Sequence, residues 1–243
     1  MPDLRPAPRT PRYARPAPGT PPPLRSPAAG SSVLRAPQRP PVDLPQRLTE
    51  VTGPLLGEER VTAADADLTV GGGGEPAGQR IVVLGRVLDG DGRPVPHTLV
   101  ELWQANAAGR YAHPRDQWAA PLDPHFTGVG RTLTDAQGGY RFTTVRPGAY
   151  PWGNHHNAWR PAHLHFSLFG RAFTQRLVTQ MYFPDDPLFA YDPIFRSVTD
   201  EHARQRMVSA FSLEQTVPSW ALTFVFDIVL RGRDATPFEA PHA

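Results

Sequence analysis

The chain of 243 residues contains 30 prolines, 21 glycines and no cysteine, at a net charge of +2. Without cysteine it cannot form disulfides, iron–sulfur clusters, zinc ribbons or thiol nucleophiles, so any metal must be held by nitrogen and oxygen ligands. No apolar run is long enough to span a membrane or to form a signal-peptide core, so we expect a cytoplasmic protein.

The first 44 residues predict an extended arm. Residues 1–40 contain seven arginines and one aspartate, with prolines between the arginines and Tyr13 as the one aromatic residue. This segment has no hydrophobic period and lacks the stacking residues of a single-strand binder, so we expect no nucleic-acid partner. We predict an arm at 1–44 that lies on its own protein or on a partner subunit, followed by one domain at 45–243.

The domain predicts an all-β fold built from many short strands. A short helix or turn is expected at 45–56, and one helix at about 200–211 with Thr199 or Asp200 as its N-cap. Strands with Gly/Pro punctuation and little helix favour a β-sandwich of mostly antiparallel strands. The predicted strands cover residues 80–89, 97–104, 130–135, 140–145, 161–169, 175–183 and 221–230.

One predicted strand carries a histidine pair. Side chains alternate along a strand, so His163 and His165 are expected on one face, about 7 Å apart, which one metal ion can bridge. A ferrous facial triad would need a carboxylate soon after the pair, but the next one is Asp185. Zinc would need a third histidine, and none has a spacing that compels the choice. Two ordinary surface histidines are the remaining alternative. The other histidines considered are His113, His125, His155, His156 and His202.

Two tyrosines in loops complete the set of candidate ligands. Tyr111 follows a predicted strand, and Tyr150 precedes the histidine pair in a Pro/Gly-rich loop. An ionised phenolate is a hard anionic ligand that suits iron(III). Both tyrosines could equally be loop-anchoring aromatic residues, and the residue pattern leaves this choice open.

Several sequence blocks, in this order and spacing, resemble the intradiol ring-cleavage dioxygenases over about residues 35–243. They are "TLVELWQANAAGRYAH", "APLDPHFTGVGRTLTDAQGGYRF", "RPGAYPW", "WRPAHLHF", "TQMYF" and "FDIVLRG". The resemblance implies a non-haem Fe(III) cofactor held by Tyr111, Tyr150, His163 and His165. It also implies that Tyr150 serves as both ligand and base, leaving the metal when substrate binds.

The resemblance extends to the function and to further site residues. It implies the iron-bearing β subunit of a heteromer, with an α subunit of the same enzyme as partner and the active site near their interface. The implied reaction, in aromatic compound catabolism, cleaves protocatechuate (3,4-dihydroxybenzoate) with O2 to 3-carboxy-cis,cis-muconate. Arg160 matches a catalytic arginine that stabilises charge on the substrate, and the matching substrate-binding residues are Trp152, Gln180 and Ile194.

One departure from the family concerns substrate choice. Family members place a tyrosine that contacts the substrate carboxylate several residues before the segment matched here by Arg35–Pro37, and Ala29 occupies that position. The alternatives are therefore a dioxygenase of the same fold acting on catechol or hydroxyquinol and, outside enzymes, a non-catalytic β-sandwich binding module.

Overall fold

The computed structural model of the chain describes residues 19–20, 60–153, 156–170 and 173–238. The predicted arm at 1–44, apart from residues 19–20, lies outside the described residues. The predicted short helix at 45–56 and Ala29 lie outside them as well.

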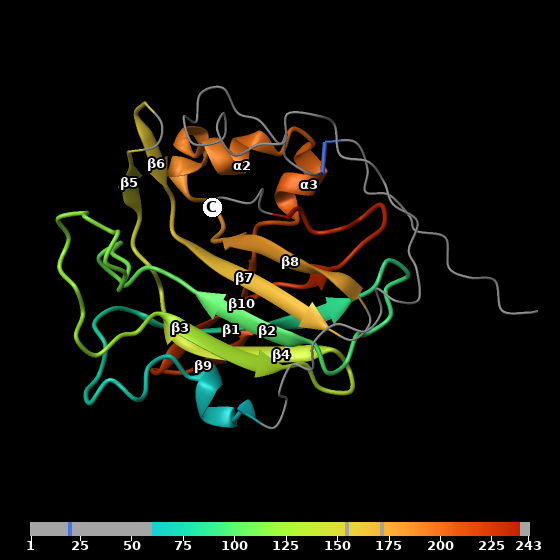
Figure 1. The fold of residues 1–243 in the computed structure, drawn as a ribbon, viewed down its shortest axis with the longest axis horizontal. Coiled ribbons are helices and arrows are strands. Elements are labelled where there is room, and N and C mark those ends of the chain that lie inside the picture. The colour runs from blue at the N-terminus through green and yellow to red at the C-terminus, as the bar shows by residue number, and fades with distance from the viewer. Residues whose placement is uncertain (1–18, 21–59, 154–155, 171–172, 239–243) are drawn as a thin grey trace, which may run out of the picture.

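Two sheets face each other and form the body of the protein (Figure 1). In the first sheet β1 pairs with β4 on one side and with β10 and β11 on the other, and β9 pairs with β10. The second sheet has the order β3-β2-β7-β8 and is antiparallel throughout. The predicted β-sandwich is confirmed, and β1 adds two parallel pairings, with β10 and β11. The strands of the first sheet are β1 (Arg80–Leu88), β4 (Gly139–Val145), β9 (Ala210–Val217), β10 (Ala221–Val225) and β11 (Ile228–Val229), and those of the second are β2 (Leu99–Trp103), β3 (Val129–Leu133), β7 (His163–Gly170) and β8 (Phe173–Tyr182).

The core lies between the two sheets. Ile81 and Phe142 of the first sheet and Leu164 and Phe166 of the second are all fully buried in one apolar cluster. The rings of Phe142 and Phe166 meet edge to face across the interface, with centroids 6.3 Å apart. The alternating apolar residues therefore determine which face of each strand points into the core. The residues that alternate with them point to the outer face of the sheet.

Tight turns join the predicted strands 80–89 and 97–104, and likewise 130–135 and 140–145, and each turn leads from one sheet to the other instead of closing a hairpin within one sheet. Residues 89–93 and 135–139 each form a compact turn, with Gly92 and Gly138 at φ of +77° and +74°. Each turn lies where it is expected, yet β1 pairs with β4 and β2 pairs with β3. The strand before each turn and the strand after it therefore belong to opposite sheets, and their inward-facing residues meet in the core.

The predicted helix at 200–211 is right at its start and wrong at its end. Asp200 caps α3 (Glu201–Gln205) by accepting a hydrogen bond from the backbone N–H of Ala203 at 2.7 Å. Beyond Gln205 the backbone pairs with the end of β8, through hydrogen bonds of Tyr182 with Met207 and Ser209, and then enters β9. Pairing with a strand therefore overrides the helical propensity of this segment. The other helices are η3 (Ala63–Ala66), η4 (Pro187–Tyr191) and α2 (Pro193–Ser197).

Two residues of the arm lie against the chain's own domain. A Cβ atom added to Gly19 would be 2.8 Å from Thr199 Oγ1 and 3.1 Å from Asp200 Cβ, and Thr20 is buried. At this point the arm contacts the residues that begin α3.

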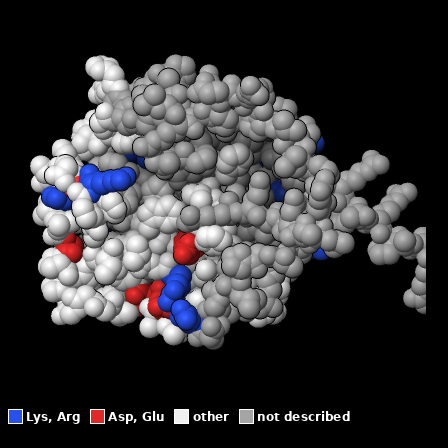
Figure 2. Space-filling view, viewed as in Figure 1, with Lys and Arg blue, Asp and Glu red and all other residues white. Residues whose placement is uncertain are grey.

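The described surface mixes both signs of charge. On the face shown in Figure 2, basic and acidic side chains lie next to one another in small groups. Exposed ion pairs of this kind join Arg86 to Asp227 and Arg131 to Asp65. Among the described helices, none is both long and apolar enough to cross a membrane.

Candidate metal centre

The four predicted ligands converge on one point. Tyr111 Oη lies 3.0 Å from His165 Nε2, 3.4 Å from Tyr150 Oη and 3.5 Å from His163 Nε2. Tyr150 Oη lies 3.4 Å from His163 Nε2. The structure therefore brings together two phenol oxygens and two imidazole nitrogens that are separated by up to 54 positions in the sequence.

Strand β7 presents the two histidines on one face. Leu164, between them, is fully buried in the core, and the rings of His163 and His165 lie with centroids 4.9 Å apart. Both histidines are also buried, with 2% and 7% of their surface exposed. The alternation expected from the sequence holds, because the face of β7 opposite Leu164 contacts the loops that carry the tyrosines.

Two glycines bring the tyrosine loops together. Gly109 has φ of +79°, and a Cβ atom there would lie 2.3 Å from the carbonyl oxygen of Ala149. A Cβ atom on Gly148 would lie 2.5 Å from the carbonyl oxygen of Ala107. The backbones of the two loops are thus in contact just before Tyr111 and just before Tyr150, a distance that only glycine permits.

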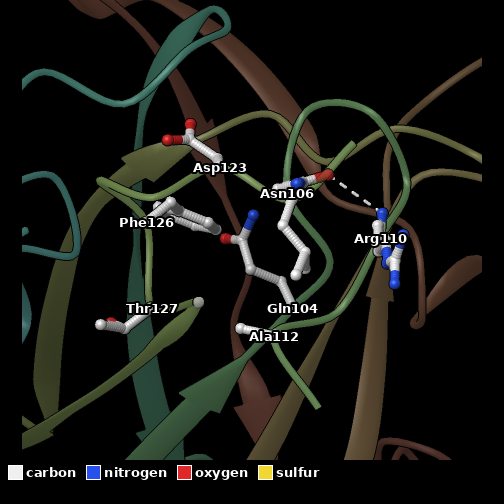
Figure 3. Close-up of a pocket in the computed structure, with 9 residues that line it drawn as sticks. Gln104, Asn106, Arg110, Ala112, Asp123, Phe126 and Thr127 are labelled. Carbon is white, nitrogen blue, oxygen red and sulfur yellow. Dashed lines mark hydrogen bonds between the residues drawn. The ribbon is translucent and has the colours of Figure 1, made fainter. Parts of the chain in front are cut away.

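The loop before Tyr111 is further fixed by Asn106. Its Oδ1 accepts hydrogen bonds from the backbone N–H groups of Ala108 and Arg110, and the second of these is the dashed line in Figure 3. Tyr111 itself donates its backbone N–H to Asp116 Oδ2 at 2.8 Å. The hollow in Figure 3 lies on this loop, and none of the predicted substrate-binding residues lines it.

The tautomer of His163 is fixed by the backbone. Its Nδ1 lies 2.6 Å from the carbonyl oxygen of Pro161, which can only accept, so Nδ1 carries the hydrogen and the lone pair is on Nε2. Burial, together with the positive charge of Arg160, lowers the pKa of His163 well below its ordinary value of 6.5. His163 is therefore a neutral imidazole with Nε2 directed at the two phenols.

Trp103 positions the other histidine. Trp103 on β2 lies opposite His165 on β7, and their rings stack with centroids 4.8 Å apart and planes 8° apart. Trp103 is not among the site residues predicted from the sequence. The strand register that places it beside His165 joins residues far apart in the chain, and no local pattern indicates it.

Behind the cluster, Arg160 is the centre of a buried polar network. Arg160 lies opposite Tyr150 in the small hairpin of β5 (Tyr150–Trp152) and β6 (Ala158–Arg160), and only 3% of its surface is exposed. Its Nη2 donates to Gln180 Oε1 and to Tyr182 Oη, and its Nε donates to Asp192 Oδ2 at 3.1 Å. Figure 1 shows this hairpin at the same end of the molecule as α2.

The remaining predicted residues lie around this network. The guanidinium carbon of Arg160 lies 5.6 Å from the centre of the Trp152 ring, a cation–π distance. Ile194 is buried at the start of α2. Tyr182 and Asp192 were missed, although "DP" before a helix is a recognisable cap signal for Asp192. Burial, with the charge of Asp192 nearby, raises the pKa of Tyr182 well above 10.0, so its hydroxyl remains a donor.

The donor set fits a single metal ion. Atoms bound to one ion at about 2.0–2.1 Å, with bond angles near 90–109°, lie about 2.9–3.4 Å from one another. Four of the separations among these atoms are 3.0–3.5 Å, within or just above this range. A metal site of another kind, built from three or more His, Asp or Glu side chains, is not present among the described residues. Phenol oxygens and imidazole nitrogens together suit a trivalent cation such as iron(III).

The sandwich fold is that of the ring-cleaving dioxygenases, and in this chain it holds two tyrosines and two histidines in a partly buried cluster. A family model described as "Dioxygenase" matches residues 51–232, and the chain belongs to this family of intradiol dioxygenases. The chain is an enzyme of that kind.

The relatives in sequence include both subunit types of one enzyme. The chain is 62% identical over 211 residues to the protocatechuate 3,4-dioxygenase beta chain of Burkholderia cepacia, which covers 86% of this chain and 89% of that one. It is 30% identical over 163 residues to the protocatechuate 3,4-dioxygenase alpha chain of Pseudomonas putida, covering 66% and 76% of the two chains.

Solved structures show the same fold. The catechol 1,2-dioxygenase of Acinetobacter sp. ADP1, inhibited by bound mercury, matches with a TM-score of 0.51 and 25% identity over 70% of this chain and 58% of that one. The 3-chlorocatechol 1,2-dioxygenase of Rhodococcus opacus 1CP matches with a TM-score of 0.54 and 21% identity over 70% and 65%.

Proposed function

We propose that this chain is the iron-bearing subunit of an intradiol dioxygenase that cleaves protocatechuate with O2 to 3-carboxy-cis,cis-muconate. The observation that carries the proposal is the convergence of Tyr111, Tyr150, His163 and His165: Tyr111 Oη lies 3.0–3.5 Å from the donor atoms of the other three, and Tyr150 Oη lies 3.4 Å from His163 Nε2. This cluster occurs in a chain that is 62% identical to a protocatechuate 3,4-dioxygenase beta chain.

Iron(III) is the metal we propose for the cluster. Two phenolates would balance part of the charge of a trivalent ion, whereas zinc sites ordinarily use histidine, cysteine and carboxylate ligands. When bound, the ferric ion would supply Lewis acidity that draws in both hydroxyl oxygens of the substrate and makes its ring reactive towards O2. His163 supports this role because the hydrogen bond from its Nδ1 to the Pro161 carbonyl leaves the lone pair on Nε2, and its lowered pKa favours this neutral form.

Tyr150 is proposed as the base that accepts a substrate proton at its phenolate oxygen. Tyr111 Oη lies within 3.5 Å of the other three donor atoms, which suits a ligand that stays in place. Tyr150 belongs instead to the small β5–β6 hairpin outside the two main sheets. A phenol on this separate hairpin can move away from the cluster without disturbing β7.

Arg160 is proposed to stabilise negative charge that develops on the substrate ring. Its guanidinium stays cationic at any working pH, and it is buried, so its field acts through little intervening water. The charge is held in place by hydrogen bonds rather than recruited during the reaction, which is the arrangement that lowers barriers most.

The substrate ring is proposed to lie among Trp152, Gln180 and Ile194. Trp152 contributes a half-buried aromatic surface and Ile194 a buried aliphatic one. The Nε2 of Gln180 is buried and has no hydrogen-bond partner among the described residues. A buried donor without a partner is costly, so a polar atom of the substrate is a suitable acceptor for it.

The partner we propose is an α subunit of the same enzyme, forming an αβ heteromer. Both the beta and the alpha chains of protocatechuate 3,4-dioxygenase are relatives of this chain, at 62% and 30% identity. The α chain would complete the substrate pocket.

A second candidate substrate class is catechol or hydroxyquinol. Ala29 favours it, since family members have at that position a tyrosine that contacts the substrate carboxylate. The test is to co-express the chain with a candidate α chain and follow oxygen uptake with protocatechuate, catechol and hydroxyquinol in parallel. We expect uptake with protocatechuate foremost. A preference for either of the other two would replace the substrate, and no uptake with any of them, despite bound iron, would contradict the proposed activity.

A further inference from the structure

We infer that Asp192 is a positioning residue that holds the Arg160 guanidinium in one orientation next to the proposed metal centre. The inference rests on the proposed function, because it assigns a role through Arg160. It concerns a carboxylate 32 positions after Arg160 in the chain, whose side chain is fully buried.

The two carboxylate oxygens of Asp192 have separate tasks. Oδ2 accepts the Nε–H of Arg160 at 3.1 Å, and Oδ1 accepts the backbone N–H of Ile194 at 2.8 Å. The side chain thus joins the arginine behind the cluster to the first turn of α2. Movement of α2 and rotation of the guanidinium are coupled through this one residue.

Three contacts determine the plane of the guanidinium. Asp192 holds the Nε edge, while Gln180 Oε1 and the Tyr182 hydroxyl both accept from Nη2. The Tyr182 hydroxyl in turn donates to Gln180 Oε1 at 2.7 Å, which fixes the position of that acceptor. A planar guanidinium held at two separate nitrogens cannot turn about the Cδ–Nε bond, so its remaining edge keeps one direction.

The carboxylate of Asp192 also offsets the charge of Arg160, with which it forms a buried ion pair. Gln180 and Tyr182 are neutral, and the side chains of Arg160 and Asp192 are 4% and 0% exposed. A buried cation without its counterion shifts towards water or recruits another anion. Without Asp192 we expect the guanidinium to change position rather than lose its charge.

The substitution Asp192→Asn separates the two tasks. Asparagine is as good an N-cap as aspartate, so its Oδ1 can still accept the Ile194 N–H. Its amide nitrogen would face the Nε–H of Arg160, donor against donor. The matched control is Asp200→Asn, because Asp200 also caps a short helix, through the backbone N–H of Ala203, and its cap bond does not involve Arg160.

The first readout needs neither iron nor activity. In the full iron-free chain labelled with ¹⁵N, the Arg160 Nε–H signal is assigned by its loss in Arg160→Gln, and its exchange with water is measured. We expect Asp192→Asn to speed this exchange at least about tenfold and Asp200→Asn to leave it unchanged. Unaltered exchange in Asp192→Asn would overturn the inference, whatever becomes of the proposed function.

The second readout is a double-mutant cycle of turnover per bound iron, in the complex with its α partner. We expect Asp192→Asn to lower kcat by about 10–100-fold with little change in KM, and Arg160→Gln by on the order of 100-fold. The double variant should be no slower than Arg160→Gln alone, because Asp192 acts through Arg160. Multiplied losses, or a parental kcat in Asp192→Asn, would contradict this role.

A purely structural role predicts a different pattern. It would lower the melting temperature and leave turnover per iron as in the parent. Asp192→Ser also keeps a cap oxygen and is studied by the same two measurements. The inference is therefore tested even if Asp192→Asn does not fold. A parent that binds no iron would instead count against the proposed function, and the exchange measurement would still decide on the arginine contact.

Discussion

Trp103 and His165 stack face to face, with ring centroids 4.8 Å apart and planes only 8° from parallel. They are direct partners in the β2–β7 register. The stacking leaves the edge of His165 that carries Nε2 facing Tyr111, 3.0 Å away. One strand pairing therefore determines how a proposed metal ligand is oriented.

Replacing Trp103 by Leu should loosen the metal site. Loss of the stack removes roughly 0.5–1.5 kcal/mol beyond the lost burial, and His165 gains freedom to rotate. We expect iron to be lost to a chelator on the order of tenfold faster, as for other residues that orient ligands. Trp103→Phe, which keeps a stacking ring, should stay within about threefold of the parent chain. Equal rates in all three proteins would rule out an orienting role.

Replacing Gly109 by Ala should separate the two tyrosine loops. Gly92→Ala is the matched control, since the two glycines have φ of +79° and +77° and a Cβ on Gly92 meets nothing within 4 Å. The control should lose about 1–2 kcal/mol of unfolding free energy from backbone strain alone. Gly109→Ala should lose a further 1–3 kcal/mol, because its Cβ overlaps the Ala149 carbonyl. Chemical denaturation measures both, and equal losses would contradict the loop contact.

Replacing Tyr150 by Phe should slow substrate binding more than it weakens iron binding. Without the phenolate there is no base to accept the substrate proton at this position, and a loss of about 10²–10⁴-fold in the rate of substrate chelation is the usual range for such a group. Stopped-flow absorbance under exclusion of O2 measures this rate. Tyr191→Phe, at a tyrosine that is 52% exposed, is the control. Unchanged binding kinetics in Tyr150→Phe would count against its role as base.

Tyr140 should make stability fall at high pH. Burial, with the charge of Asp227 nearby, raises the pKa of Tyr140 well above 10.0, and its hydroxyl donates to the Phe226 carbonyl. The folded protein therefore keeps the proton while the unfolded chain releases it above about pH 10, so the stabilisation is complete below pH 10 and is lost as the pH rises further.

Denaturation of the parent and of Tyr140→Phe between pH 8 and 11 tests this linkage. Below pH 10 the parent should be more stable by about 1–2 kcal/mol, the contribution of a buried hydrogen bond. Above pH 10 the difference should shrink by up to about 1.4 kcal/mol per pH unit. A difference that stays constant up to pH 11 would show that Tyr140 ionises equally in both states.

The fold was predictable wherever the pattern was local. Alternation along a strand predicted β1, β2, β7 and β8 to within a few residues. The pairing of those strands was not predictable, because either sheet accepts the same apolar alternation. The last turns of the helix predicted at 200–211 were wrong because Met207 and Ser209 pair with Tyr182, far away in sequence.

The site residues, too, were predictable from the sequence only where a local pattern indicated them. Alternation alone paired His163 with His165, whereas Tyr111 and Tyr150 entered through the resemblance of whole sequence blocks. The structure adds residues whose roles depend on contacts between segments far apart in the sequence. Trp103 reaches His165 through strand register, and Asp192 reaches Arg160 across 32 positions, from the start of α2.

The measurement closest to the central claim is the visible spectrum of the purified, iron-loaded chain together with its metal content. Two phenolates bound to iron(III) should give a red-brown protein with about one iron per chain, and the band should weaken in Tyr111→Phe and in Tyr150→Phe. Tyr191→Phe should leave it unchanged. A colourless chain that is active with zinc, or a band that survives both substitutions, would contradict a ferric site built from these tyrosines.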